Sequence, residues 1–299
     1  MRIAIDLNDV IRNFTGRIEE IYCKYINENF NIYDVLEESD GDFRKILPFK
    51  TKIDYFKFLY EDYPLEIFGN ATFKNKRLVG ELNMWLSNLE NEETKKPVEV
   101  IIVCPNEQHL SIQATCFFLS KFIRVRKVLF PTNSKEVWDS CDVLITANPT
   151  LIKTKPKTKK LIKIQTEYNK KYTDIDYSFK NLNDFIEYTV EKSVIELRDR
   201  CVDALKKEFS SLKYMELKIG SFTDEQYKEL EEKRKNDGKE LKYKKEKLLI
   251  GDTILEIRFY LQYNDVLTTE DIKNIKKFVK NWYKNELAFR NKIRKMIFK

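Results

Sequence analysis

Five short runs rich in valine, isoleucine and leucine recur through the first 165 residues, and segments with helical periodicity separate them. The runs are residues 2–7, 98–104, 126–130, 141–146 and 160–164. Runs of this kind are typical of strands covered by helices on both sides, as in parallel sheets. Their alternation with helices predicts an α/β fold built on a doubly wound parallel sheet.

The charge of the chain changes near residue 206. Residues 206–299 carry 24 Lys and Arg against 16 Asp and Glu, whereas residues 1–205 carry 31 against 32. This break predicts a domain of residues 1–205 and a basic α+β extension of residues 206–299. Three interpretations of the basic charge stay open: a solvated surface, docking to an acidic partner, or binding of nucleic acid.

The extension is expected to end in a long helix. The sequence Thr268-Thr269-Glu270-Asp271 resembles a capping box, and a helix from about 270 to 297 should follow it. About 28 helical residues span roughly 40 Å, more than a small domain needs to cover itself. The helix is therefore interpreted as an arm that contacts other protein subunits in a homo- or hetero-oligomer. Its apolar face would consist of Ile272, Ile275, Val279, Trp282, Phe289, Ile293 and Met296.

Composition and single residues exclude several other classes. No apolar stretch is long enough to cross a membrane, and Asp6 interrupts the first apolar run too early for a secretory signal. The five cysteines include no C-x-x-C pair, which favours a reduced compartment. His109 is the only histidine, so a multi-histidine metal site is excluded, and a structural or surface role is expected for it. The location predicted is cytoplasmic or within a virion, not secreted.

The segment Asp6-Leu7-Asn8-Asp9-Val10 follows the first apolar run directly. It resembles the first motif of the haloacid-dehalogenase-like (HAD) phosphohydrolases, in which Asp-x-Asp-x-[Thr/Val] follows four apolar residues. The 5′(3′)-deoxyribonucleotidase branch is most similar, because its helical cap lies between the first and second motifs. The aromatic-rich residues 43–68 occupy that place here. The resemblance covers about residues 1–190 and implies a HAD-like, Rossmann-like sheet with a small helical cap at about 14–92.

The resemblance also implies a chemistry. In the family, the first Asp attacks phosphorus and the second transfers protons to the leaving group and from water. Acidic residues after the fourth strand help to hold Mg²⁺. A hydroxyl after the second strand and a Lys or Arg hold the phosphoryl oxygens.

This sequence departs from that pattern at most positions. Asp6 keeps the nucleophile position, but Asn8, an amide, takes the acid/base position, and Asp9 is a poor substitute for it. Cys104 stands where the hydroxyl is expected. Thr146 and Ala147 replace the metal-binding acids in the frame Asp142-Val143-Leu144-Ile145-Thr146-Ala147-Asn148-Pro149. Three residues are candidates for the phosphate-holding cation: Lys121, Arg124 and Lys127.

These departures predict a pseudoenzyme without a metal or cofactor, which serves as a structural or assembly component through protein–protein contacts. The Lys-, Asn- and Ile-rich composition is typical of AT-rich genomes, so a phage virion is one candidate setting. The alternative is a Mg²⁺-dependent 5′(3′)-deoxyribonucleotidase-like enzyme. It would use Asp6 as nucleophile and metal ligand, together with Asp9 and Lys121.

Overall fold

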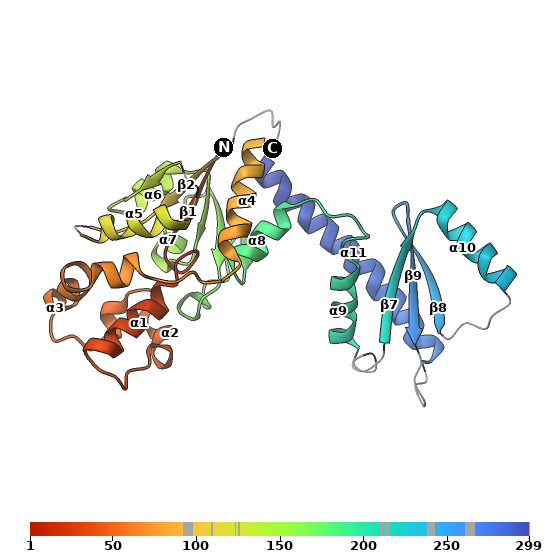
Figure 1. Cartoon of the computed structure of the whole chain (residues 1–299), viewed down its shortest axis with the longest axis horizontal. Coiled ribbons are helices and arrows are strands. Elements are labelled where there is room, and N and C mark those ends of the chain that lie inside the picture. The colour runs from red at the N-terminus through yellow and green to blue at the C-terminus, as the bar shows by residue number, and fades with distance from the viewer. Residues whose placement is uncertain are drawn as a thin grey trace. The chain divides into compact units, whose positions relative to one another are not determined.

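The computed structural model describes residues 1–91, 98–108, 110–122, 124, 126–209, 212, 216–237, 243–260 and 267–298 (Figure 1). The chain divides into two compact units. The first consists of Met1–Thr189 together with Ile297–Lys299, and the second of Val190–Met296. Each unit has its own sheet, and the two are described separately below.

The first unit is built on a six-stranded sheet in which every described pair of neighbouring strands is parallel. The strand order is β3-β2-β1-β4-β5-β6. This confirms the predicted α/β class; β6 is a short strand that no apolar run indicated. The strands are β1 (Arg2–Asp6), β2 (Glu99–Val103), β3 (Val128–Leu129), β4 (Val143–Thr146), β5 (Lys160–Ile164) and β6 (Tyr177–Phe179).

The register of the three central strands positions the site. Asp6 on β1 is paired with Val103 on β2, and Ile5 is paired with Ile145 on β4. The carboxyl ends of these strands therefore meet at one edge, where open α/β sheets bind ligands. Cys104 and Ala147, which follow β2 and β4, lie at the same edge as Asp6, as the sequence predicted.

Helices fill the connections between the strands of the first unit. After β2 the chain forms α5 (Leu110–Phe122), then α6 (Ser134–Ser140), α7 (Pro149–Lys153) and α8 (Leu182–Thr189). Asn148 accepts a hydrogen bond from the backbone N–H of Thr150 and so caps α7, which has Pro149 in its first turn. The Asn148-Pro149 frame thus starts a helix directly at the edge of the sheet.

A helical lobe lies between β1 and β2. It begins with α1 (Phe14–Tyr25) and continues through short helical segments: η1 (Ile32–Asp34), α2 (Leu36–Ser39), η2 (Phe43–Lys45), α3 (Lys52–Lys57), η3 (Phe58–Asp62) and η4 (Leu65–Gly69). Its aromatic side chains pack edge to face, as in the contacts of Tyr22 with Phe30, Phe49 and Phe58. The aromatic run of the sequence is therefore a core, as expected.

The last helix before β2 packs beside the sheet and is not part of the lobe. α4 (Leu78–Asn91) packs against α8, with the rings of Trp85 and Phe185 5.9 Å apart. Phe185 in turn contacts Phe179 on β6. The expected cap of residues 14–92 is therefore too long at its carboxyl end, because the apolar face of α4 is buried beside the sheet.

The second unit contains an antiparallel sheet of order β7-β9-β8. Its strands are β7 (Glu216–Phe222), β8 (Lys244–Ile250) and β9 (Thr253–Tyr260), and its helices are α9 (Arg198–Glu208), α10 (Asp224–Asp237) and α11 (Thr269–Phe298). Gly251, with φ of 56°, and Asp252 connect β8 to β9 in a hairpin, a turn that the Gly251-Asp252 pair between two apolar runs of the sequence also predicts. Thr268 and Asp271 form the expected capping-box contacts at the start of α11.

The unit boundary lies earlier than residue 205, where the sequence placed it. Leu197, Cys201 and Leu205 are fully buried in the core of the second unit, together with strand residues such as Leu255 and Ile257. Helix α9 therefore belongs to the second unit. The break in charge marked a change of surface composition, whereas the boundary between the units follows the packing of apolar side chains.

The apolar face of α11 packs on the core of the second unit along its first half. Ile275, Val279 and Ile293 are fully buried, and Ile272 and Trp282 pack against the core of the second unit. Phe289 and Met296 are half-buried. The part of α11 that carries Ile272, Ile275, Val279 and Trp282 therefore supplies one wall of its own domain, and contact of its far end with other subunits stays a prediction. In the part of the chain that the structure describes, no helix has the length and apolarity needed to cross a membrane.

Candidate functional site

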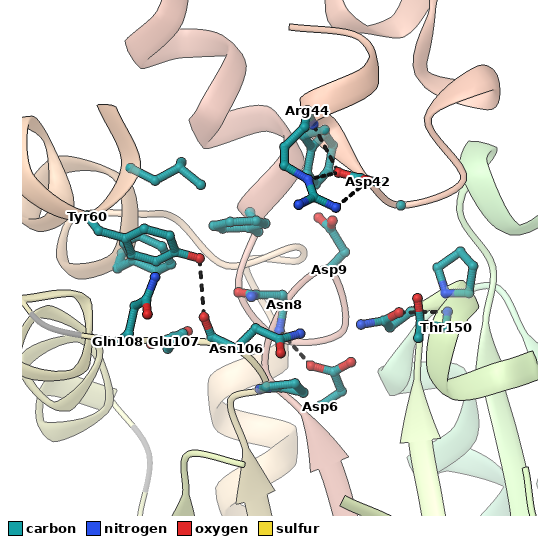
Figure 2. Close-up of a pocket in the computed structure, with 18 of the residues that line it drawn as sticks. Asp6, Asn8, Asp9, Asp42, Arg44, Tyr60, Asn106, Glu107, Gln108 and Thr150 are labelled. Carbon is teal, nitrogen blue, oxygen red and sulfur yellow. Dashed lines mark hydrogen bonds and ion pairs between the residues drawn. The ribbon is translucent and has the colours of Figure 1, made fainter. Parts of the chain in front are cut away.

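A cavity of about 570 Å³ lies at the carboxyl edge of the parallel sheet, beneath the helical lobe (Figure 2). Its lining comes from the lobe and from the loops at this edge of the sheet, including Thr132 after β3 and Tyr168 after β5. The loops contribute Asp6, Asn8 and Asp9 after β1, residues 105–108 after β2, and residues 148–150 after β4. The lobe contributes Asp42, Arg44 and aromatic side chains including Phe14, Phe43, Tyr55, Tyr60 and Phe68.

Asp6 lies at the end of β1 and is only 2% exposed. Its carboxylate accepts a hydrogen bond of 2.7 Å from the Thr146 hydroxyl and a longer one of 3.4 Å from the Asn8 N–H. Asp6 forms no ion pair with any described residue. Burial removes water from the carboxylate and raises its pKa to about 7, an effect that the two hydrogen bonds offset only in part.

The raised pKa of Asp6 makes the stability of the first unit depend on pH. The folded state binds the proton more tightly than the unfolded state, so the neutral carboxyl stabilises the fold at low pH. This contribution is lost as pH rises from about 4 through about 7. From pH 4.5 to pH 8, the free energy of unfolding of the wild type should fall by about 2–4 kcal/mol relative to that of Asp6→Asn, which has no carboxyl group to ionise at this position. Urea unfolding of both proteins at the two pH values measures this fall, and parallel pH profiles would contradict it.

Asn8, at the position of the family's acid/base, is fixed by a buried arginine. Arg12 is fully buried, and its Nε and Nη2 donate to the Asn8 side-chain oxygen at 2.9 and 2.6 Å. The same guanidinium pairs with Glu107 and donates to Thr115 Oγ1 at 2.7 Å and to the Phe68 carbonyl at 3.2 Å. The oxygen of Asn8 is thus committed to Arg12, and an amide has no proton to transfer at neutral pH.

Asp9 is a structural residue. It adopts a left-handed backbone conformation, with φ of 57°, and is 1% exposed. Its carboxylate accepts hydrogen bonds from the Thr15 N–H and hydroxyl, from the Tyr168 hydroxyl at 2.9 Å, and from Lys74 at 3.4 Å. These contacts hold the loop after β1 against the first turn of α1, and they leave Asp9 poorly placed to transfer protons.

The cations expected from the sequence are not brought to the cavity. Lys121 lies 3.5 Å from Asn70 Oδ1 and over the ring of Phe117, outside the cavity lining. Lys127 pairs with Glu99 at 3.2 Å, and Arg124 is exposed. The cation that does line the cavity is Arg44 from the lobe.

Arg44 forms two hydrogen bonds of 2.7 Å with Asp42. Sequence reasoning missed both residues, and it also missed Arg12 and Glu107. The only signal for Asp42 and Arg44 was their opposite charge at a separation of two residues in an aromatic-rich segment.

The residues at the sheet edge do not fit a Mg²⁺ ion. Mg²⁺ requires several hard oxygen ligands in octahedral geometry. Thr146 uses its hydroxyl proton to bond Asp6, Ala147 has no side-chain oxygen, and the carboxylate of Asp9 is already saturated. Among the described residues, no three His, Cys, Asp or Glu side chains gather in a metal-binding group. Asp6 would be the sole acidic ligand available.

Two further candidates from the sequence are Cys104 and His109. Cys104 is fully buried at the end of β2, and burial raises the pKa of its thiol well above the usual value, which makes it unreactive. His109 lies outside the described residues. The chemistry that the cavity can support therefore depends on Asp6 and on the amide, hydroxyl and aromatic groups around it.

Comparisons with known proteins add only a distant structural similarity. No family model matches the sequence, and no curated protein matches it. Among solved structures, the chain is similar to a protein of Burkholderia xenovorans described as a haloacid dehalogenase-like hydrolase. The TM-score is 0.41 and the identity 10%, covering 62% of this chain and 94% of that one. What this chain does must therefore be inferred from its own residues.

Proposed function

We propose that this chain is a HAD-like protein that lacks phosphohydrolase activity and acts by binding, as a structural or assembly component. The observation that carries the proposal is the contact between Arg12 and Asn8. At the position where proton transfer is required, the side chain is an amide whose oxygen accepts two hydrogen bonds from a fully buried guanidinium. General acid/base catalysis is worth about 10²–10⁴-fold in rate, and none of the described residues of this site is in place to supply it.

The same contact supports a loss that is deeper than one substitution. An aspartate at position 8 would place its carboxylate where Arg12 now donates two hydrogen bonds. The guanidinium would hold that carboxylate ionised, and an ionised carboxylate cannot protonate a leaving group. We therefore expect Asn8→Asp alone to restore no activity. Restoration would also require Arg12 to be replaced and metal ligands to be supplied near Ala147.

The charge of the cavity also opposes phosphate. Four carboxylates line it: Asp6, Asp9, Asp42 and Glu107. Among the described residues of the lining, the one cation is Arg44, and it is already paired with Asp42. A phosphoryl group would enter without the Lys, Arg or metal ion that normally neutralises it.

The test is phosphate release from deoxynucleoside monophosphates and simple aryl phosphates in Mg²⁺, measured in parallel for the wild type and Asp6→Asn. The proposal predicts indistinguishable rates at the background level. Asp6→Asn is a suitable control because an amide can keep the contact with the Thr146 hydroxyl while removing the nucleophile. Mg²⁺-dependent release that disappears in Asp6→Asn would favour the alternative, a 5′(3′)-deoxyribonucleotidase-like enzyme.

The assembly role depends on sequence features rather than on contacts. Protein partners, in a homo- or hetero-oligomer, and a cytoplasmic or virion setting follow from the degenerate site and from the composition. Nucleic acid is a weaker candidate partner, suggested by the basic extension. Sedimentation of the purified chain, alone and in a lysate, tests this part of the proposal. A monomer without associates would contradict it.

A further inference from the structure

We propose that the cavity above Asp6 binds a small organic cation, an ammonium or guanidinium group carried on an apolar scaffold. This inference deepens the proposed function, because a site that does not process phosphate is free to hold a ligand of the opposite charge. Two independent features of the cavity carry it: one carboxylate without a counter-ion, and walls made of aromatic rings.

The first feature is the pairing of the carboxylates that line the cavity. Asp42 is bonded to Arg44 through both of its oxygens at 2.7 Å. Glu107 pairs with buried Arg12, and Asp9 lies 3.4 Å from Lys74. Each of these three carboxylates therefore has a cation of its own. Among the described residues, Asp6 has none within ion-pair distance.

Asp6 is also the carboxylate whose charged form most needs a counter-ion. It is 2% exposed, so water stabilises its charge poorly, and the nearby hydrogen bonds come from one hydroxyl and one distant N–H. Figure 2 shows its carboxylate below Asn8 and Asn106, among the residues that line the cavity. A cation that entered the cavity would complete the same one-to-one pairing that the other three carboxylates already have.

The second feature is the aromatic wall contributed mainly by the lobe. The rings that line the cavity are Phe14, Phe43, Tyr55, Phe56, Tyr60, Phe68 and Tyr168. They form a connected set: Phe14 contacts Phe43 and Phe68, and Tyr60 stacks on Phe68 at 5.8 Å. The faces of aromatic rings attract organic cations and also cover the apolar part of such a ligand.

Size and charge limit the alternatives. A cavity of about 570 Å³ is within the range of roughly 300–1,000 Å³ typical of small-molecule sites. Bare Mg²⁺ is a poor occupant, because it requires more oxygen ligands than Asp6 supplies and gains little from aromatic walls. A phosphate ester would be repelled by the carboxylates. An organic cation satisfies both the unpaired carboxylate and the rings.

The experiment compares three probes of similar shape: benzylammonium, benzyl alcohol and phenyl phosphate. Calorimetric titration at pH 8 is expected to show benzylammonium binding at least about tenfold more tightly than benzyl alcohol, because a charge-assisted hydrogen bond is worth more than a neutral one. Phenyl phosphate is expected not to bind. Equal affinity for the charged and neutral probes, or binding of phenyl phosphate or of Mg²⁺ in their place, would overturn the proposal.

Two variants assign the effect to Asp6. Asp6→Asn should remove the preference for benzylammonium, with the fold verified by circular dichroism. The double variant Glu99→Gln/Lys127→Gln removes a paired carboxylate and its cation outside the cavity, so it should keep the preference. A preference that survives Asp6→Asn would overturn the proposal. Phosphate release by the wild type would contradict the proposed function. The affinities of the three probes would still show, independently, whether the cavity binds an organic cation.

Discussion

Deletion of residues 267–299 should unfold the Val190–Met296 unit rather than detach an arm from it. The deletion removes Ile275, Val279 and Tyr283, which are fully buried in the core of that unit, together with partly buried Ile272 and Trp282. A single large-to-small substitution in a core costs about 2–5 kcal/mol, and a whole domain is stable by only about 5–15 kcal/mol. Hydrogen exchange of the amides in β7 and β9 measures the loss of the unit.

Point variants on the same helix separate core packing from the deletion itself. Tyr283→Ala should cost about 3–5 kcal/mol, because it leaves a cavity and removes the hydroxyl that donates to the Val194 carbonyl at 3.3 Å. Lys284→Ala, at the exposed neighbouring position, should leave the unfolding midpoint unchanged. Protected β7 and β9 amides in the deleted chain would contradict this prediction, because the helix would then be dispensable for the unit. A deleted chain that no longer assembles would not identify α11 as an interface, because unfolding of the unit would also prevent assembly.

Arg12→Ala should destabilise the first unit by about 3–5 kcal/mol, because it leaves Glu107 buried without its cation. The change also removes donors from Asn8, Thr115 and the Phe68 carbonyl, and so loosens the contact between the loop after β1 and the lobe. Lysine is not a conservative replacement here, because one ammonium cannot reproduce the planar set of donors. Urea unfolding followed by the fluorescence of Trp85 and Trp138, both in the first unit, measures the cost.

Two controls distinguish this buried pair from an ordinary ion pair. Arg44→Ala breaks the more exposed pair with Asp42 and should cost no more than about 1 kcal/mol. The double variant Arg12→Met/Glu107→Leu removes both buried charges and should be more stable than Arg12→Ala alone. If Arg12→Ala were as stable as Arg44→Ala, the Arg12 guanidinium would not be the group that holds the Asn8 side chain in place.

The sequence was most informative where local pattern decides structure. The apolar runs indicated β1, β2, β3, β4 and β5, and the parallel pairing of β1 with β2 and β4 brings Asp6, Cys104 and Ala147 to one edge because parallel strands end together. The capping box at Thr268 and the hairpin at Gly251 were also visible, since each depends on residues within a few positions of one another. β6 has only three residues, too few to give a pattern.

The sequence was least informative where distant residues decide structure. Nothing next to Arg12 marks it as buried, because Glu107 and Thr115, which satisfy it, lie about a hundred residues further along the chain. For the same reason the residues that line the cavity from the lobe, Asp42 and Arg44, could not be assigned to it. The sequence indicated an apolar stripe on α11 but not its buried Tyr283, and periodicity does not reveal what covers such a stripe.

The central claim, that Asp6 does not attack phosphorus, is tested most directly with 4-nitrophenyl phosphate. Nitrophenolate is a good leaving group that needs little help from a general acid, so the missing proton donor at Asn8 cannot mask a reactive nucleophile. Rapid mixing of concentrated protein with excess substrate and Mg²⁺ would reveal phosphoryl transfer as a burst of nitrophenolate equal to the protein concentration. The structure predicts no burst, with wild type and Asp6→Asn giving the same slow background line. A stoichiometric burst in the wild type that Asp6→Asn abolishes would contradict the account.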